Sequence, residues 1–250
     1  MSKIPENRKF MQCPSFKEGM THSDQSKGVA APAFGKAITG PLTVLPPFDG
    51  ITTATYANLL DSRRSVRSYK NTPMTQAQLA FMLWSVNGIQ HTRNDVSSFR
   101  PVPSGGARHP FETYITVRNV EGLAPGLYHY LPTENMGEKL ATIQFLGDIP
   151  NYEDTITEMV AGQNWAAKAP VVLFYSCIPY KAEWRYHEMA HRVVLIDLGH
   201  VGQNAMLSAA ALGLGSCCMA AYDQQACDKV IGLSNPDEYV VYGVAVGTLE

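Results

Sequence analysis

The sequence predicts an α+β fold. Several short runs rich in β-branched and aromatic residues are typical of strands, and one long stretch, residues 184–212, repeats small and apolar residues at helical spacing. These segments do not alternate as regular strand–helix–strand units, which argues against a parallel α/β sheet. With 250 residues and 45% hydrophobic content, the chain is long and apolar enough to bury a substantial core.

The chain divides into an N-terminal arm and one main domain. Residues 1–50 contain six prolines and no sustained apolar period, so we expect an irregular arm, able to wrap the body or a partner subunit. Residues 51–250 carry the periodic segments and are expected to form a single domain.

The main domain contains clear helix and strand signals. Thr75 and Gln78 match a capping box, and the apolar stripe within residues 79–86 predicts a helix that Gly88 ends. Residues 56–60 predict a short helix capped by a preceding threonine. The other predictions are strands at 111–117, 127–131, 141–146, 171–177 and 238–246, helices at 153–161, 184–212 and 223–232, and a polar loop at 91–100.

Composition limits the classes of function. A formal net charge of -2 gives no general attraction to nucleic acid or an anionic membrane, and the first residues lack the apolar core of a signal peptide. The uncharged stretch 198–222 holds polar residues and four glycines, which fits a buried helix and turn better than a membrane span. The five cysteines are irregularly spaced, so we expect reduced thiols in the cytoplasm.

A basic cluster at residues 61–67 is the first candidate for a binding site. It contains Arg63, Arg64, Ser65 and Arg67. Guanidinium groups match phosphate oxygens bidentately and keep their charge, while hydroxyls and backbone N–H groups satisfy the remaining oxygens. The cluster therefore predicts a phosphate site, although an exposed basic turn would have the same composition.

A turn-rich segment before the strand at 111–117 is the second candidate. Pro103, Ser104, Gly105 and Gly106 would let backbone N–H groups approach the edge of a flat heteroaromatic ligand. An ordinary turn before a strand is the alternative. No Gly-x-Gly-x-x-Gly follows a strand and no P-loop motif is present, so neither common nucleotide site is supported.

Residues 187–191 read His-Glu-Met-Ala-His, a pattern in which His187 and His191 bind zinc and Glu188 is the general base. A third ligand is poorly placed, because Asp197 lies about 120° around a continuous helix from His191. A packed or cofactor-adjacent histidine pair is therefore favoured over a zinc hydrolase, and we expect no metal site.

The preceding residues Arg185 and Tyr186 are candidates for catalysis. Tyr186 can donate or accept a proton, whereas Arg185 cannot be deprotonated and can act only through its charge. A tyrosine on the core side of a helix terminus is the structural alternative.

In this order, four segments together resemble the nitroreductase superfamily of FMN enzymes and, within it, the SagB-type dehydrogenases related to thiazole/oxazole-forming oxidases. They are residues 62–67 (SRRSVR), 103–111 (PSGGARHPF), 125–130 (PGLYHY) and 190–215, which contains DLGHVGQN and ALGLG.

The resemblance implies a nitroreductase-like fold, with a central mixed or antiparallel sheet flanked by helices. It also implies a homodimer with a long central helix in the dimer contact and two FMN sites at the interface. Its implied FMN contacts fall into three groups. These are Arg63, Arg64, Ser65 and Arg67 at the phosphate and ribityl chain, Pro103, Ser104, Gly105 and Gly106 of the other subunit at the flavin edge, and Gln163, Met219, Ala220 and Ala221 near the ribityl chain and flavin N5.

The sequence departs from the family pattern at two places. The last residues carry no Lys or Arg, so the first cluster would hold more of the phosphate charge. In azoline oxidases a Lys-Tyr pair is associated with catalysis, and the matching positions here are Arg185 and Tyr186.

These features predict an FMN-dependent oxidoreductase that transfers hydride through flavin N5, in a ping-pong reaction, between a donor such as NAD(P)H and a small-molecule substrate. Dehydrogenation of peptide thiazolines or oxazolines is the alternative within the same class. Outside redox chemistry, the alternatives are the zinc hydrolase and a non-catalytic flavin-binding protein.

Overall fold

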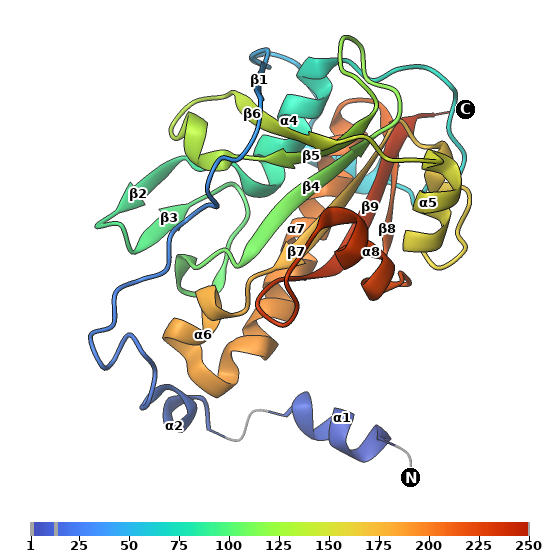
Figure 1. The fold of residues 1–250 in the computed structure, drawn as a ribbon. Coiled ribbons are helices and arrows are strands. Elements are labelled where there is room, and N and C mark those ends of the chain that lie inside the picture. The colour runs from blue at the N-terminus through green and yellow to red at the C-terminus, as the bar shows by residue number, and fades with distance from the viewer. Residues whose placement is uncertain (1–2, 13–14, 250) are drawn as a thin grey trace.

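The computed structural model describes residues 3–12 and 15–249. Its centre is a seven-stranded sheet in the order β1-β6-β5-β4-β7-β9-β8, in which every neighbouring pair is antiparallel (Figure 1). The strands are β1 (Leu42–Leu45), β4 (Phe111–Val117), β5 (Gly126–Tyr130), β6 (Ala141–Gly147), β7 (Val171–Cys177), β8 (Leu214–Met219) and β9 (Tyr239–Thr248). The predicted α+β class is confirmed.

Helices cover both faces of this sheet. The face that packs against α4 (Gln76–Asn87) and α7 (Ala190–Ala211) holds the larger core cluster, and the face with α5 (Tyr152–Met159) and α8 (Gln224–Ile231) holds the second. All seven residues of β4 and of β7 are buried, because each central strand is covered on both sides. The capping box before α4 is present, with Thr75 and Gln78 bonding each other's backbone N–H groups.

The predicted single helix over residues 184–212 is wrong in its first part. The helix α6 (Tyr180–Tyr186) ends where His187 adopts φ 47°, a 3₁₀ turn η4 (His187–Met189) follows, and α7 begins at Ala190. A positive φ on a non-glycine residue breaks the helical path. The five-residue His-Glu-Met-Ala-His pattern therefore does not lie on one continuous helix.

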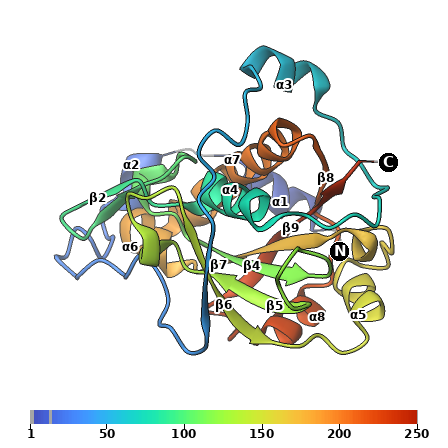
Figure 2. The ribbon, with the colours of Figure 1, turned by 90° about the horizontal axis from the view of Figure 1, so that it is seen from above.

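One further segment differs from expectation, and the short helix before the basic cluster does not. Residues 91–100, predicted as a loop, contain a small hairpin of β2 (His91–Arg93) and β3 (Ser97–Phe99). The short helix α3 (Tyr56–Ser62) forms as predicted, with the Thr55 side chain accepting from the N–H of Asn58, and it extends beyond α7 on the side away from the sheet (Figure 2). Three 3₁₀ turns complete the list of elements: η1 (Gly105–Ala107), η2 (Pro132–Asn135) and η3 (Ala166–Lys168).

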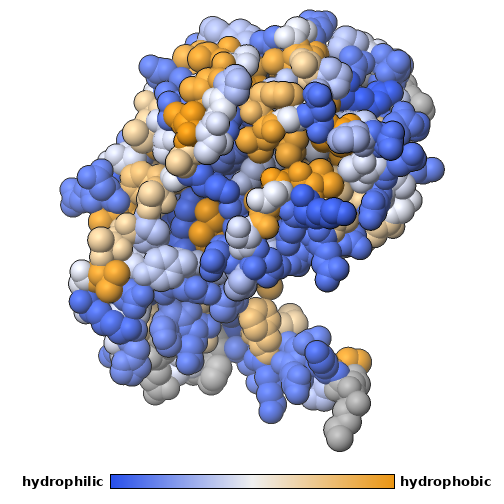
Figure 3. All heavy atoms as spheres, viewed as in Figure 1, coloured by the Kyte–Doolittle hydropathy of each residue, from blue (hydrophilic) through white to orange (hydrophobic). Residues whose placement is uncertain are grey.

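The N-terminal arm follows a long path over the body. It begins with α1 (Ile4–Phe10), which stands away from the rest of the protein in the space-filling view (Figure 3). After α2 (Phe16–Met20) the chain forms turns at residues 21–28 beside α6 and later enters the sheet as edge strand β1, paired with β6. In the part of the chain that the structure describes, no helix combines the length and apolar character needed to cross a bilayer.

Candidate functional site

The basic cluster begins where α3 ends and is fixed by backbone contacts with the last strands. The N–H of Val66 donates to the carbonyl of Ser216 at 2.9 Å, and the N–H of Lys70 donates to the carbonyl of Thr248 at 3.0 Å. The Tyr69 hydroxyl also donates to the carbonyl of Val66 at 2.7 Å. The cluster is thus tied to β8 and β9, a long-range contact that sequence reasoning missed.

The guanidinium groups of the cluster contact carbonyls and an aromatic ring. Arg64 donates to the carbonyls of Asp61 and Arg63, and the guanidinium of Arg67 lies 5.8 Å from the ring centroid of Trp165. Among the described residues, no carboxylate forms an ion pair with Arg63, Arg64 or Arg67. Unpaired guanidiniums at one place create an electropositive site suited to an anion.

A cavity of about 360 Å³ lies beside the cluster. Its lining includes Arg63 and Arg64, Ser216 of β8, and the apolar side chains of Met206 and Ala210 of α7. Ser65 and Arg67 are exposed and do not line it. The cavity therefore combines cationic and apolar surfaces, as a phosphate-bearing organic ligand would require.

Gln163 and the segment that follows β8 lie together. The Gln163 amide donates to the carbonyl of Ala221 at 2.7 Å and to that of Val160 at 3.0 Å. Ala220 and Ala221 are exposed, whereas Met219 is buried at the end of β8. Since Trp165 contacts Arg67, this pair of loops adjoins the basic cluster.

The Pro103–Gly106 turn is attached to α7 by a buried carboxylate. Asp197 accepts from the Ser104 hydroxyl at 2.6 Å and from the N–H of Gly105 at 3.0 Å, and the Ser104 oxygen in turn accepts from the N–H of His109 at 2.9 Å. Burial raises the pKa of Asp197, and these hydrogen bonds act in the opposite direction. Sequence reasoning weighed Asp197 only as a metal ligand, and the structure shows it fixing this turn.

Two glycines of the turn lie directly against the candidate catalytic pair. Gly106 has φ 58°, and a Cβ there would lie 2.4 Å from Cδ of Arg185 and 2.8 Å from the hydroxyl of Tyr186. A Cβ on Gly105 would lie 2.3 Å from Cγ1 of Val193. The structure thus brings Arg185 and Tyr186 to the predicted flavin-edge turn, and only glycine leaves room for them.

The environments of Arg185 and Tyr186 differ. Tyr186 is buried, and its ring meets that of Phe16 edge-on at 5.8 Å. Arg185 is half-buried and donates from Nη1 to the side-chain oxygen of Gln25 at 2.9 Å, while its Nε has no acceptor. The nearby imidazole of His109 is neutral at physiological pH, because burial and then the charge of Arg100 lower its pKa to about 3.

The zinc hypothesis gains no geometric support. His191 pairs with Glu183 at 2.8 Å, and His187 lies at the break between α6 and α7. Within residues 3–12 and 15–249, no group of three or more His, Cys, Asp or Glu side chains could hold a metal ion.

The candidate residues form two groups at different positions along α7. The turn contacts α7 at Val193 and Asp197, whereas the cavity of the basic cluster contacts it at Met206 and Ala210. At a rise of about 1.5 Å per residue, Asp197 and Ala210 are roughly 20 Å apart along the helix. Leu195 and Ile196, each 54% exposed, lie beside the turn's contacts at Val193 and Asp197.

Comparison with known proteins identifies relatives of this chain. A protein of Methanocaldococcus jannaschii named as a nitroreductase is 33% identical over 165 residues, which are 66% of this chain and 78% of that protein. The microcin B17-processing protein McbC of Escherichia coli is 30% identical over 139 residues, which are 54% of this chain and 48% of McbC. The solved structure of a nitroreductase-like protein from Anabaena variabilis has 27% identity and a TM-score of 0.61, and the match covers 77% of this chain and 38% of that one.

This chain therefore spans about half the length of McbC. The model of the nitroreductase family matches residues 60–248, and the resemblance seen in the ordered motifs is confirmed. Because the matched residues make up about three quarters of the sequence, the chain belongs to the nitroreductase family.

Proposed function

We propose that the protein is an FMN-dependent oxidoreductase that acts as a homodimer in two half-reactions. The observation that carries the proposal is the set of unpaired guanidiniums beside a cavity of about 360 Å³ between α3, α7 and β8. When bound, the flavin would supply the redox chemistry, taking up hydride at N5 from a donor such as NAD(P)H and passing it to a second substrate.

The residues present fit such a cofactor. Arg63 and Arg64 would bind the phosphate, with Ser65 and Arg67 at the ribityl chain or the outer phosphate oxygens. The Pro103–Gly106 turn, which has no room for a Cβ at its glycines, would meet the ring edge through its backbone other than the Gly105 N–H, which is bonded to Asp197. Gln163 and the exposed backbone of Ala220 and Ala221 would complete the site on the side of the basic cluster.

A homodimer is supported by the separation of these two groups. On one chain the cluster, which would hold the phosphate, and the turn, which would meet the ring edge, are roughly 20 Å apart along α7. A second copy packed on α7, where Leu195 and Ile196 are exposed beside the turn, would bring the turn of one subunit to the cluster of the other.

In this arrangement Tyr186 would donate or accept the proton that accompanies hydride transfer. Arg185 would act through its charge. Both side chains pack on Gly106, so they would face the reacting edge of the ligand.

Peptide azoline dehydrogenation is the second candidate, favoured by the similarity to McbC, which is named as a microcin-processing protein. It would require Tyr186 to handle the proton without a neighbouring Lys, since Arg185 cannot serve as a base. A thiazoline-containing peptide tested beside NAD(P)H and nitroaromatic or quinone acceptors would distinguish the two reactions.

The absorption spectrum of purified protein, recorded before and after denaturation with zinc measured on the same sample, tests the cofactor. We expect about one FMN per chain and no stoichiometric zinc. A colourless protein that FMN cannot reconstitute would refute the proposal, and bound flavin that no donor or acceptor can turn over would favour the non-catalytic alternative.

A paired substitution tests the phosphate site. Arg63→Ala with Arg67→Ala should release the flavin and leave the fold intact, because charge-assisted hydrogen bonds contribute roughly 1.5–3 kcal/mol each. Arg93→Ala is the matched control, since this exposed arginine lies on the β2–β3 hairpin against the ring of Phe99. Unchanged flavin content in the double variant would move the site elsewhere.

A further inference from the structure

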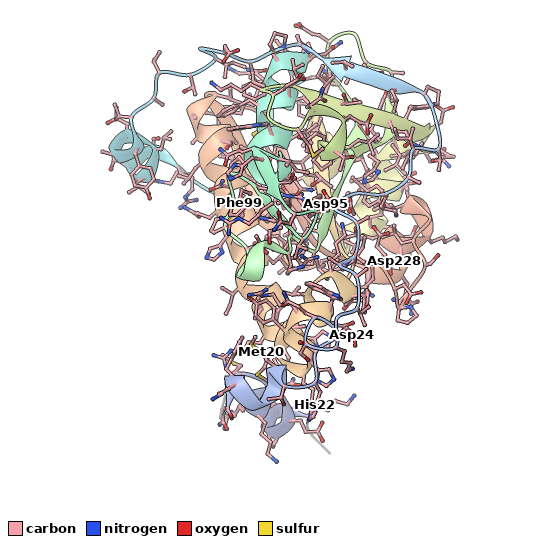
Figure 4. All side chains as sticks on the ribbon, turned by 90° about the vertical axis from the view of Figure 1, so that its left-hand side faces the viewer. Met20, His22, Asp24, Asp95, Phe99 and Asp228 are labelled. Atoms are coloured by element: carbon pink, nitrogen blue, oxygen red, sulfur yellow. The ribbon has the colours of Figure 1, made fainter. Side chains whose placement is uncertain are left out.

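The N-terminal arm is attached to α6 by four hydrogen bonds around residues 24–29, one of which is made by Arg185. The N–H of Gln25 donates to the carbonyl of Trp184 at 2.8 Å, and the indole N–H of Trp184 donates to the carbonyl of Val29 at 2.9 Å. The Tyr180 hydroxyl donates to Asp24 at 3.0 Å. Figure 4 shows Asp24 and Met20 on the arm, at the end of the molecule where α6 lies. The arm is therefore a fixed neighbour of the candidate catalytic pair.

Gln25 is the point at which the arm reaches Arg185. Its side-chain oxygen accepts from Nη1 of Arg185 at 2.9 Å, and it is the one acceptor that the described residues offer this guanidinium. Because the backbone N–H of Gln25 is also bonded to α6, its side chain starts from a fixed position. Gln25 thus restrains the guanidinium at Nη1, while Gly106 lies close to Cδ and Nε of the same side chain.

The carboxylates near Arg185 are engaged elsewhere. Asp24 pairs with Lys27, Glu183 pairs with His191, and Asp197 accepts from the Ser104–Gly105 turn. The neighbouring Arg108 bonds only the backbone carbonyls of Lys181 and Val96, and burial and then the charge of Arg185 lower its pKa. Arg185 therefore lies in a region of unbalanced positive charge beside Tyr186.

We propose that Gln25 is a positioning residue that orients Arg185 without neutralising it, and that Arg185 thereby selects a substrate carrying a carboxylate or similar anionic group. This inference rests on the proposed function, in which Arg185 and Tyr186 face the substrate. An amide oxygen accepts a hydrogen bond as a carboxylate does, but it brings no countercharge. The positive charge of Arg185 stays available to an incoming anion, and a buried site strengthens that attraction.

Two nitroaromatic probes of nearly equal shape test the inference. The probes 4-nitrobenzoate and 4-nitrobenzamide differ by one negative charge, and their binding is measured by calorimetry on the purified protein together with kcat/KM. The wild-type protein should bind the benzoate about tenfold more tightly than the benzamide. This ratio corresponds to a difference of about 1.4 kcal/mol in binding free energy.

Gln25→Glu keeps an acceptor for Arg185 and adds a countercharge. The ratio of the affinities for benzoate and benzamide should therefore fall from about ten to about one. Lys17→Gln is the matched control, since it changes the net charge of the arm by the same amount at an exposed residue of α2. It should leave the preference within about twofold of wild type. Arg185→Gln should abolish the preference, and flavin content with the melting temperature verifies that each variant is folded.

Equal binding of the two probes by wild type, or no binding of either, overturns the inference. A benzoate preference that survives Gln25→Glu overturns the role of Gln25. The proposed function fails separately: it is refuted if the probes bind with the expected preference and neither probe nor any other acceptor is turned over. If both probes are reduced without a charge preference, the function stands and the inference fails.

Discussion

Gly106→Ala tests whether the turn at Gly106 holds Arg185 and Tyr186 in place. A control glycine with a similar backbone conformation measures the effect of backbone strain by itself. At φ 58° a side chain costs about 1–2 kcal/mol of conformational strain. The new Cβ would also overlap Arg185, which must move and weaken its bond to the half-buried Gln25, for about 1 kcal/mol more. The total is about 2–3 kcal/mol, or a fall in melting temperature of roughly 4–12 °C at about 2–4 °C per kcal/mol.

Gly232→Ala is the control. Gly232 ends α8 with φ 79°, and a Cβ there meets nothing within 4 Å, so this variant carries the strain without the overlap. Thermal unfolding and steady-state turnover are measured on both proteins with flavin content. Gly106→Ala should lower kcat about 100-fold, since small displacements of catalytic groups have effects of that size, and Gly232→Ala should leave it near wild type. Equal kcat values for the two folded variants would show that Gly106 does not hold the groups that act on substrate.

Two further predictions concern the buried ions and the dimer. Burial by itself would raise the pKa of Glu112, but its contacts with Lys181 and His129 outweigh burial and hold the pKa at about 2. Ionised Glu112 therefore stabilises the folded protein above pH 4.5, and this stabilisation is lost as the pH falls toward 2. Glu112→Gln should therefore cost about 3 kcal/mol at pH 7, and urea unfolding should show the difference shrinking toward pH 2; a constant difference would contradict the ion-pair explanation. Gly199 lies on the exposed face of α7, and Gly199→Ala should stabilise the isolated subunit by about 1 kcal/mol. The added methyl group would lie in the subunit contact and should raise the dimer Kd measured by sedimentation equilibrium. An unchanged Kd would exclude this face as the contact.

Elements that depend on neighbouring residues in the sequence were predicted correctly, whereas an edge strand and a helix break were missed. The Thr75–Gln78 capping box and the strands at 111–117 and 171–177 were predictable, because capping is local and a run of apolar residues identifies a central strand. The edge strand Leu42–Leu45 was not recognised, since it is short and lies between prolines. The break at His187 was also missed, because the apolar spacing continues through it.

The candidate site was predictable in its residue types but not in its arrangement. The cluster of arginines and the glycine turn suggested a phosphate and a flat ring from composition and spacing. Ser216, Asp197 and Gln25 could not be found in that way, since each meets its partner across more than 90 residues of sequence. The separation of the two groups along α7 likewise depends on tertiary packing.

The position of β9 within the sheet has a consequence for biosynthesis. This strand lies between β7 and β8, and with Leu249 it also contacts the segment that follows the basic cluster. On the ribosome β9 is made after every other described helix and strand, so β8 has no sheet neighbour until then. The cavity beside Ser216, which Leu249 also lines, would be completed only after residues 239–249 are translated.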